Sequence, residues 1–388
     1  MRAPDLDRIL SAMLRTYDGI SDLNFSVGHP LQVEDFGELK PVFVDPPIER
    51  LTPYQTEQLA LTLMQGNRRL MHEYLVNGSC DCSYAIAGEA RFRVNIFRQR
   101  GHCTIVMRKL QSEIPSLQSL NLPEIFSEIA KEKTGLVLVT GATGSGKTTT
   151  LAALLNEINQ TQAVHIVTLE DPIEFVHPIG RATFNQRELG HDFDNYPNGL
   201  RAALRQAPKV ILVGEMRDRA TVEVALMAAE TGHLVVSTLH TVDAGHAIHR
   251  ILGLFSLGEE SQLRLRLANT IRYIVSQRLA PKIGGGRQLL TEIMGNNLRT
   301  RESIALGESE NRSFYEIIEA SSSFGWATFD QSILSAYEAG AIDEETARIF
   351  ASKKGKVIRA IDLMQKMRGI GNELDTGLRL DLPVNAFR

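Results

Sequence analysis

The stretch from Gly141 to Thr148 reads Gly-Ala-Thr-Gly-Ser-Gly-Lys-Thr and has the residue types of a phosphate-binding loop. Its glycines let the backbone wrap a polyphosphate with its N–H groups inward, at a helix N-terminus whose partial positive charge favours anions. In this pattern Lys147 reaches the β- and γ-phosphates, and the Thr148 hydroxyl ligates Mg²⁺. The predicted nucleotide-binding residues are Gly141, Ala142, Thr143, Gly144, Ser145, Gly146, Lys147, Thr148 and Thr149.

Carboxylates follow two further apolar segments. Hydrolysis of a nucleotide needs such groups to hold Mg²⁺ indirectly and to activate water. Glu170, Asp171 and Glu174 come just after one segment, and Glu215 ends another. We expect Glu174 to be the general base, with Glu170 as the competing candidate. We expect Glu215 to act on Mg²⁺, through water.

Two histidines, His233 and His240, flank a fourth apolar segment. A single histidine at such a place is more often a hydrogen-bonded structural residue than a catalytic one. Here the strand order suggests that His240 faces the γ-phosphate and that His233 lies near the catalytic glutamate. Both are therefore candidate catalytic residues.

The elements that must position these groups are apolar strands separated by helices. Continuous apolar strands of this kind form a parallel sheet covered on both faces, which binds ligands at the carboxyl ends of its strands. The fold class is α/β. The expected strands are Leu136–Thr140, His165–Leu169, Val210–Gly214 and Leu234–Leu239, with a helix from the loop to about Asn159.

The region before the phosphate loop mixes both periodicities and predicts an α+β domain. Helical spacing occurs from Leu6 to Leu14 and from Gln58 to Leu75. In the segment 90–97, alternation places Arg91 and Arg93 on one strand face, opposite the apolar residues. The other expected strands are Leu23–Val27, Cys82–Ile86 and Cys103–Arg108.

The length favours more than one domain, because a chain of 388 residues is longer than those that usually fold around a single hydrophobic core. The segment between Pro115 and Pro123 is the best linker, and the pattern after Leu298 is helical. The expected division is 1–112 for the N-terminal domain, 113–123 for a linker, 124–298 for the nucleotide-binding core, 299–367 for a helical region and 368–388 for a loose tail.

Composition restricts the classes of partner. The net charge is −4 and no long basic run occurs, which argues against a protein held on nucleic acid by a basic field. A nucleic-acid translocase is therefore disfavoured. No apolar stretch is long enough to span a bilayer, and the N-terminus has no signal-peptide core, so we expect a cytoplasmic protein.

Four sequence boxes stand in a fixed order along the chain: GATGSGKT (141–148), LEDPIEF (169–175), VILVGEMRD (210–218) and AAETGHLVVSTLHT (228–241). In this order they resemble the secretion and type IV pilus ATPases, the GspE-like superfamily, and within it the PilT/PilU twitching-motility retraction ATPases. The resemblance extends over nearly the whole chain, to the segment Thr328-Phe-Asp-Gln331.

The resemblance implies a homohexameric motor whose subunits combine an N-terminal PAS-like domain with a C-terminal RecA-like domain. ATP and Mg²⁺ would lie between the two, and the motion would be passed to an inner-membrane platform protein at the cytoplasmic face. The family's arginine fingers correspond to Arg91, Arg93 and Arg108, which would contact the phosphates. The resemblance also assigns Glu174 to water activation, Glu215 to the Mg²⁺ shell and His233 and His240 to the histidine box.

Some features leave alternatives open. The segment 297–306 departs from the basic helix of PilT proteins and is more similar to the PilU branch. An accessory subunit, acting beside a paralogous retraction ATPase, is therefore one alternative. An assembly or type II secretion ATPase is another, although those relatives usually carry an additional N-terminal domain and many carry a four-cysteine zinc insert.

Overall fold

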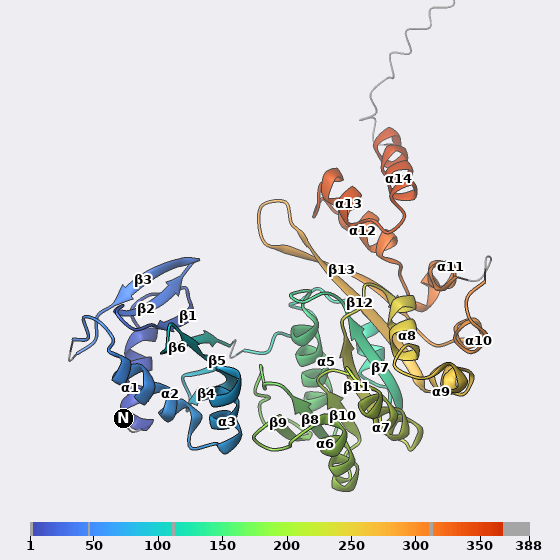
Figure 1. Ribbon diagram of the computed structural model, residues 1–388. Helices are drawn as coiled ribbons and strands as arrows, with labels where there is room; N and C mark the ends of the chain where they lie inside the picture. The colour runs from blue at the N-terminus through green and yellow to red at the C-terminus, as the bar shows by residue number, and fades with distance from the viewer. Residues whose placement is uncertain (1–2, 46, 111–112, 310–312, 368–388) are drawn as a thin grey trace, which may run out of the picture.

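The computed structural model describes residues 3–45, 47–110, 113–309 and 313–367. Two sheets, each with its own hydrophobic core, form two domains, and helices extend beyond the second (Figure 1). The α/β class predicted from the sequence is confirmed. The predicted tail, 368–388, lies outside the described residues.

The N-terminal sheet is antiparallel, in the order β3-β2-β1-β6-β5-β4. In β5, Phe92, Val94 and Ile96 are fully buried while Arg91 and Arg93 lie on the opposite face, as the alternation predicts. The six strands are β1 (Ile20–Phe25), β2 (Leu31–Asp35), β3 (Glu38–Val42), β4 (Ser79–Ile86), β5 (Ala90–Gln99) and β6 (His102–Lys109).

Helices α1 (Ala3–Leu14), α2 (Pro53–Met64) and α3 (Arg68–Asn77) share the core of this sheet. The prediction of one helix from Gln58 to Leu75 is wrong, because the chain turns between α2 and α3. Gln65 ends α2 in the left-handed conformation with φ 50°, and the Asn67 side chain caps the first N–H groups of α3. In the sequence, Gly66 and Asn67 indicate the end of one helix and the start of the next.

The second sheet has the order β13-β12-β7-β11-β10-β8-β9. All pairs are parallel except β12 with β13. Strands β7, β10 and β11 are buried along their whole length, so both faces of the sheet are covered. Its strands are β7 (Gly135–Thr140), β8 (His165–Glu170), β9 (Thr183–Glu188), β10 (Val210–Val213), β11 (Leu234–Leu239), β12 (Ile271–Pro281) and β13 (Arg287–Met294).

Helices and short 3-10 turns surround the second sheet (Figure 1). Leu117 is buried in their common core, so the segment predicted as a linker packs on the second domain from this residue onward. These helices are α4 (Ile125–Ile129), α5 (Lys147–Thr161), α6 (Tyr196–Ala203), α7 (Arg219–Glu230), α8 (Ala244–Leu252) and α9 (Glu260–Thr270), and the turns are η1 (Leu204–Gln206) and η2 (Leu257–Glu259).

The C-terminal region is helical, as predicted, and its helices form a small separate core together with Ala280 of β12 and Leu290 of β13. Asp330, only 2% exposed, joins its parts: its carboxylate accepts hydrogen bonds from the N–H groups of Ser352 (2.7 Å) and Lys353 (2.9 Å) and from the Tyr315 hydroxyl (2.8 Å). Its elements are α10 (Leu298–Leu306), α11 (Phe314–Glu319), η3 (Ser322–Phe324), α12 (Phe329–Glu338), α13 (Glu344–Phe350) and α14 (Lys354–Met367).

Within the described ranges, no helix is both long and apolar enough to cross a membrane.

Candidate nucleotide site

The phosphate loop connects β7 to α5 at the carboxyl edge of the parallel sheet. Gly141 has a φ of 148°, and a Cβ built on it would lie 2.6 Å from the carbonyl oxygen of Gln277 in β12. Gly146 has a φ of 88° at the position before the helix begins. Glycine is therefore required at both ends of the loop for different reasons: close packing at the first, and backbone conformation at the second.

Lys147 shows that the loop is built for an anion. Its ammonium group is nearly buried and donates hydrogen bonds to the carbonyl oxygens of Gly141 (2.8 Å) and Ala142 (2.9 Å). Burial lowers the pKa of Lys147, and the charges of Glu215 and Glu174 oppose this shift. The Ser145 hydroxyl is buried and has no hydrogen-bond partner. A phosphate fits this loop because it would satisfy both groups.

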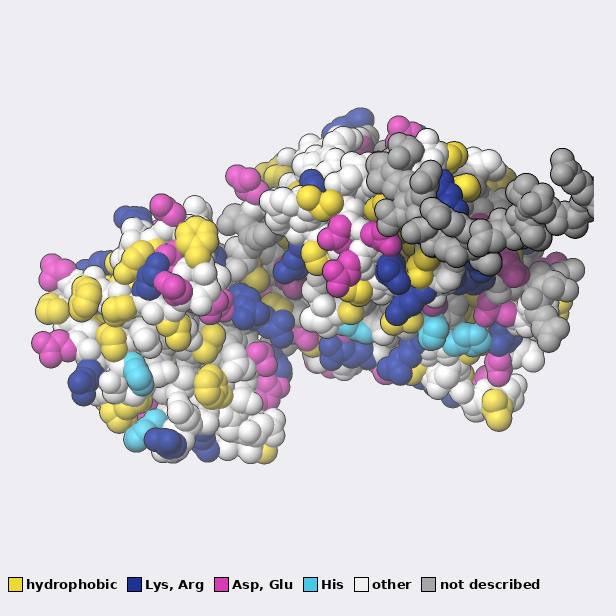
Figure 2. Space-filling model, turned by 90° about the horizontal axis from the view of Figure 1, so that it is seen from above, with side chains coloured by type: hydrophobic (Ala, Val, Ile, Leu, Met, Phe, Trp, Pro, Cys, Tyr) yellow, Lys and Arg dark blue, Asp and Glu magenta, His cyan; other side chains and the backbone are white. Residues whose placement is uncertain are grey.

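An open cleft of about 570 Å³ runs along the loop and reaches the N-terminal domain. Of the predicted site residues, it collects Thr143, Gly144, Gly146, Lys147, Thr148, Thr149, Glu170, Glu174, Glu215, His240 and Arg93. Seen from above, Lys and Arg side chains gather along the boundary between the domains (Figure 2). The cleft thus places cations and carboxylates around one space, as a nucleotide with a divalent cation requires.

Glu215 follows β10 and lies in the cleft beside two partners. Its carboxylate forms an ion pair with Arg217 at 2.5 Å and lies 3.8 Å from Nε2 of His240. Burial and the Lys147 ammonium lower the pKa of His240, so its imidazole is neutral at pH 7. His240 therefore lines the cleft as a hydrogen-bonding group.

Glu170 and Glu174 differ in their surroundings. Loss of hydration raises the pKa of Glu170 to about 7, although hydrogen bonds from Thr168 (2.5 Å) and Gln186 (3.0 Å) to its Oε1 oppose the shift. In the part of the chain that the structure describes, no side chain or backbone group forms a hydrogen bond or ion pair with the Glu174 carboxylate. Glu174 is thus the carboxylate that is available to a water molecule in the cleft.

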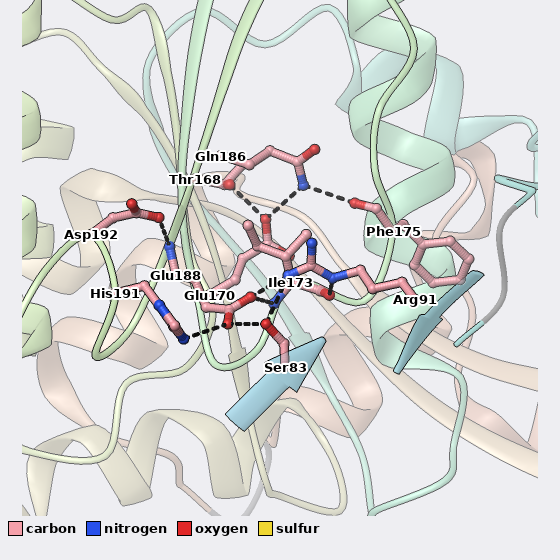
Figure 3. Close-up of polar contacts among 10 residues, drawn as sticks. All are labelled: Ser83, Arg91, Thr168, Glu170, Ile173, Phe175, Gln186, Glu188, His191 and Asp192. Atoms are coloured by element: carbon pink, nitrogen blue, oxygen red, sulfur yellow. Dashed lines mark hydrogen bonds and ion pairs between the residues drawn. The ribbon is translucent and has the colours of Figure 1, made fainter. Parts of the chain in front are cut away.

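Arg91 occupies a different place from the predicted one. Its Nε donates a hydrogen bond to the carbonyl oxygen of Ile173 (2.9 Å), and its Nη2 forms an ion pair with Glu188 of β9 (Figure 3). It does not line the cleft. In this structure Arg91 thus contacts the loop before Glu174.

Two other predicted residues also lie away from the cleft. Arg108 forms an ion pair with Asp22 (2.9 Å) inside the N-terminal sheet. His233 stands just before β11, and its Nδ1 lies 3.0 Å from the carbonyl oxygen of Ala228. The prediction that His233 lies near the catalytic glutamates is wrong for the single chain, because the amino end of β11 is at the opposite sheet edge from the phosphate loop.

Three residues in or beside the site were not predicted from the sequence, and one of them, Arg287, lines the cleft. Arg287 begins β13 and reaches the cleft only through the pairing of β12 with β13, which no local pattern announces. Gln186 and Glu188 bind the acidic loop from β9. The segment Asn185-Gln-Arg-Glu188 does place Gln186 and Glu188 two residues apart, on one face of a strand. Their contact with the acidic loop, however, depends on how β9 lies beside β8.

A phosphate loop joined to strand-end carboxylates on a parallel sheet defines a P-loop nucleoside triphosphatase. The model for the family described as "Type II/IV secretion system protein" matches residues 79–324. This match covers more than half of the chain, so the protein belongs to that family. It is a P-loop ATPase.

Two related proteins and one crystal structure show which members of this family the chain is similar to. The type IV pilus retraction ATPase PilT of Pseudomonas aeruginosa is 40% identical over 330 residues, 85% of this chain and 94% of that protein. The type IV pilus ATPase PilU of the same organism is 36% identical over 344 residues, 88% of this chain and 87% of that protein. A crystal structure described as the pilus retraction motor PilT with bound ADP has a TM-score of 0.80 and 41% identity, over 92% of this chain and 99% of that chain.

Proposed function

We propose that this protein is a motor ATPase that couples ATP hydrolysis to retraction of type IV pili, and so to twitching motility. The observation that carries the proposal is the cleft in which the phosphate loop, the carboxylates and Arg93 of the N-terminal domain meet. A nucleotide bound there would contact both domains. The chain is similar to PilT over most of both chains, and this similarity supports pilus retraction as the work that the domain movement performs.

The residues of the cleft fit defined roles. Lys147 and the loop N–H groups would hold the phosphates, and Thr148 would hold Mg²⁺ with Glu215 acting through water. Mg²⁺, when bound, neutralises charge on the phosphate oxygens. Arg93 lines the cleft from β5 and would balance the charge on the γ-phosphoryl group.

For hydrolysis, we assign the water-activating role to Glu174. Its carboxylate would accept a proton as the water oxygen attacks the γ-phosphorus and the bond to the β-phosphate oxygen breaks. Glu170 is the weaker candidate for this base, because Thr168 and Gln186 already bind its Oε1 and its pKa of about 7 leaves it partly protonated at neutral pH. His240, neutral beside Glu215, would hydrogen-bond to the phosphate or to water.

The assembly follows from the same proposal. We infer a homohexameric ring at the cytoplasmic face of the inner membrane, acting on a platform protein of the pilus machine. Each subunit would hinge between its domains before Leu117, in the first part of the predicted linker, because the rest of the linker packs on the second domain. No role for nucleic acid is proposed.

The experiment is to purify the protein, measure ATP hydrolysis with Mg²⁺, and compare Lys147→Ala. Removing the ammonium leaves the phosphates without their main cation, so we expect a loss of hydrolysis of at least about 100-fold and non-retracting pili. Absence of hydrolysis by the wild-type protein, with normal retraction in the Lys147→Ala strain, would refute the motor.

The similarity of segment 297–306 to the PilU branch suggested a second role, that of an accessory subunit beside a paralogous retraction ATPase. The identity to PilT is slightly higher than that to PilU, and does not point to the PilU branch. Expression in a strain that lacks its main retraction ATPase separates the two roles. Restored retraction would establish a self-sufficient motor, and continued loss would establish an accessory subunit.

A further inference from the structure

Strand β9 holds the loop that carries Glu174. Gln186 donates a hydrogen bond to the carbonyl oxygen of Phe175 (2.8 Å) and accepts one from the N–H of His177 (3.0 Å). Two positions along β9, Glu188 accepts a hydrogen bond from the N–H of Ile173 (3.1 Å). The loop backbone is therefore fixed on both sides of Glu174 by two side chains from one strand face (Figure 3).

The N-terminal domain takes part in the same contacts. Arg91 donates to the carbonyl oxygen of Ile173 and pairs with Glu188, while the Ser83 hydroxyl donates to Glu188. Both backbone polar groups of Ile173, the residue before Glu174, are thus bound. One is held by a side chain of the ATPase domain and the other by a side chain of the N-terminal domain.

The burial of Glu188 makes this arrangement sensitive to either partner. Glu188 is 5% exposed, so its charge is poorly screened by water. Removing one member of a buried ion pair leaves the other member uncompensated, which costs far more than loss of a surface pair. If the N-terminal domain moves away, the Glu188 carboxylate and the Ile173 carbonyl lose Arg91 together.

We propose that Glu188 and Gln186 are positioning residues that fix Glu174 for hydrolysis, and that Arg91 makes this position depend on the N-terminal domain. The proposal rests on the role assigned to Glu174 in the proposed function. In this arrangement the domain movement reaches the hydrolytic centre through the backbone of Ile173. Arg91 then acts on the loop, whereas a finger arginine acts on a phosphate.

The test compares Glu188→Gln, Arg91→Ala and the double variant in the full-length protein. We expect each single variant to lower kcat at least tenfold with the Kd for ATP in the presence of Mg²⁺ unchanged within about twofold, and the double variant to lose no more than the worse single one. The control is Glu319→Gln, which breaks the ion pair with Lys356 in the C-terminal region and should leave kcat unchanged.

Amide hydrogen exchange gives a readout that does not need activity. In Glu188→Gln we expect faster exchange at Ile173, at least tenfold, with no change in β7. Unchanged kcat, equal losses of kcat and ATP affinity, or multiplicative losses in the double variant would each overturn the proposal. If the wild-type protein hydrolyses no ATP, the motor fails, and the exchange at Ile173 still decides whether Glu188 holds the loop.

Discussion

Lys147 and Glu170 are ionisable groups whose charged forms are both disfavoured by burial away from water. Burial lowers the pKa of Lys147 and raises that of Glu170 to about 7. The two shifts have opposite signs because desolvation favours the neutral form of each group. Neither shift can be read from the sequence, since each depends on which side chains close the cleft.

Replacing Glu170 with Gln should change how stability depends on pH. The pKa of Glu170 rises from 4.5 to about 7 on folding. The contribution of Glu170 to the free energy of unfolding is therefore fully present below about pH 4.5 and is lost as pH rises through 7. The loss is about 3 kcal/mol at pH 8. Glutamine keeps an Oε1 acceptor for Thr168 and Gln186 and has no charge to lose or gain, so Glu170→Gln should avoid this loss of stability at high pH.

Urea denaturation at pH 5 and pH 8 measures this effect. The wild-type and variant midpoints should be similar at pH 5, and the variant should be the more stable protein at pH 8. Part of the pH dependence should remain in the variant, because burial also raises the pKa of Glu292 to about 7. An equal difference between the two proteins at both pH values would refute the assignment.

At the scale of elements, the four strands predicted for the second sheet are where the sequence predicts them, whereas β9, β12 and β13 are not predicted. In β9 the sequence Thr-Phe-Asn-Gln-Arg-Glu has few apolar residues, because it pairs only with β8 at the sheet edge. β7 and β11 are buried between neighbours and so must be apolar. Prediction therefore succeeded for the four strands with uninterrupted apolar runs, and it missed β9, whose polar side chains contact the acidic loop, as well as the more mixed β12 and β13.

The turn from β7 into α5 gives a prediction about two glycines. Both Gly141 and Gly144 have positive φ, but a Cβ on Gly141 would meet the Gln277 carbonyl oxygen, whereas nothing lies within 4 Å of one on Gly144. Alanine at position 144 should cost about 1 kcal/mol from backbone strain alone. Alanine at position 141 should cost clearly more, because backbone must also move.

Thermal unfolding without nucleotide separates the two variants, since binding then plays no part. We expect the larger fall in Tm for Gly141→Ala and a smaller fall for Gly144→Ala. Equal falls would mean that β12 does not pack against the loop as described.

At the scale of the whole molecule, the face of β5 that bears Arg91 and Arg93 is turned to the ATPase domain. The alternation of β5 predicted that a basic face exists. It could not predict which arginine enters the cleft, because that depends on how the domains meet. Arg93 lines the cleft, Arg91 meets Glu188, and Arg108 stays with Asp22.

Asp330 joins α12 to α11 and to the turn before α14, and Asp330→Ala should loosen this connection. The substitution leaves the N–H groups of Ser352 and Lys353 and the Tyr315 hydroxyl without their acceptor. We expect a loss of about 3 kcal/mol or more from this region, since bonds to a charged acceptor are the stronger ones.

Limited proteolysis measures this loss as faster cleavage around residues 350–354. The control is Asp343→Ala, which removes only the helix cap on Thr346 and should cost about 1 kcal/mol. If both variants resist the protease as well as the wild type, Asp330 does not secure the helices.

The position of β7 between β11 and β12 limits how the protein can be dissected. β12 begins at Ile271, far along the chain from the phosphate loop. A fragment that ended before this residue would retain every residue of the loop and of the acidic, Glu215 and histidine boxes. It would also expose the edge of β7, whose sequence Gly-Leu-Val-Leu-Val-Thr is apolar and free of charge. Such an edge pairs readily with other chains, so a fragment chosen by its motifs alone would aggregate before its nucleotide chemistry could be measured.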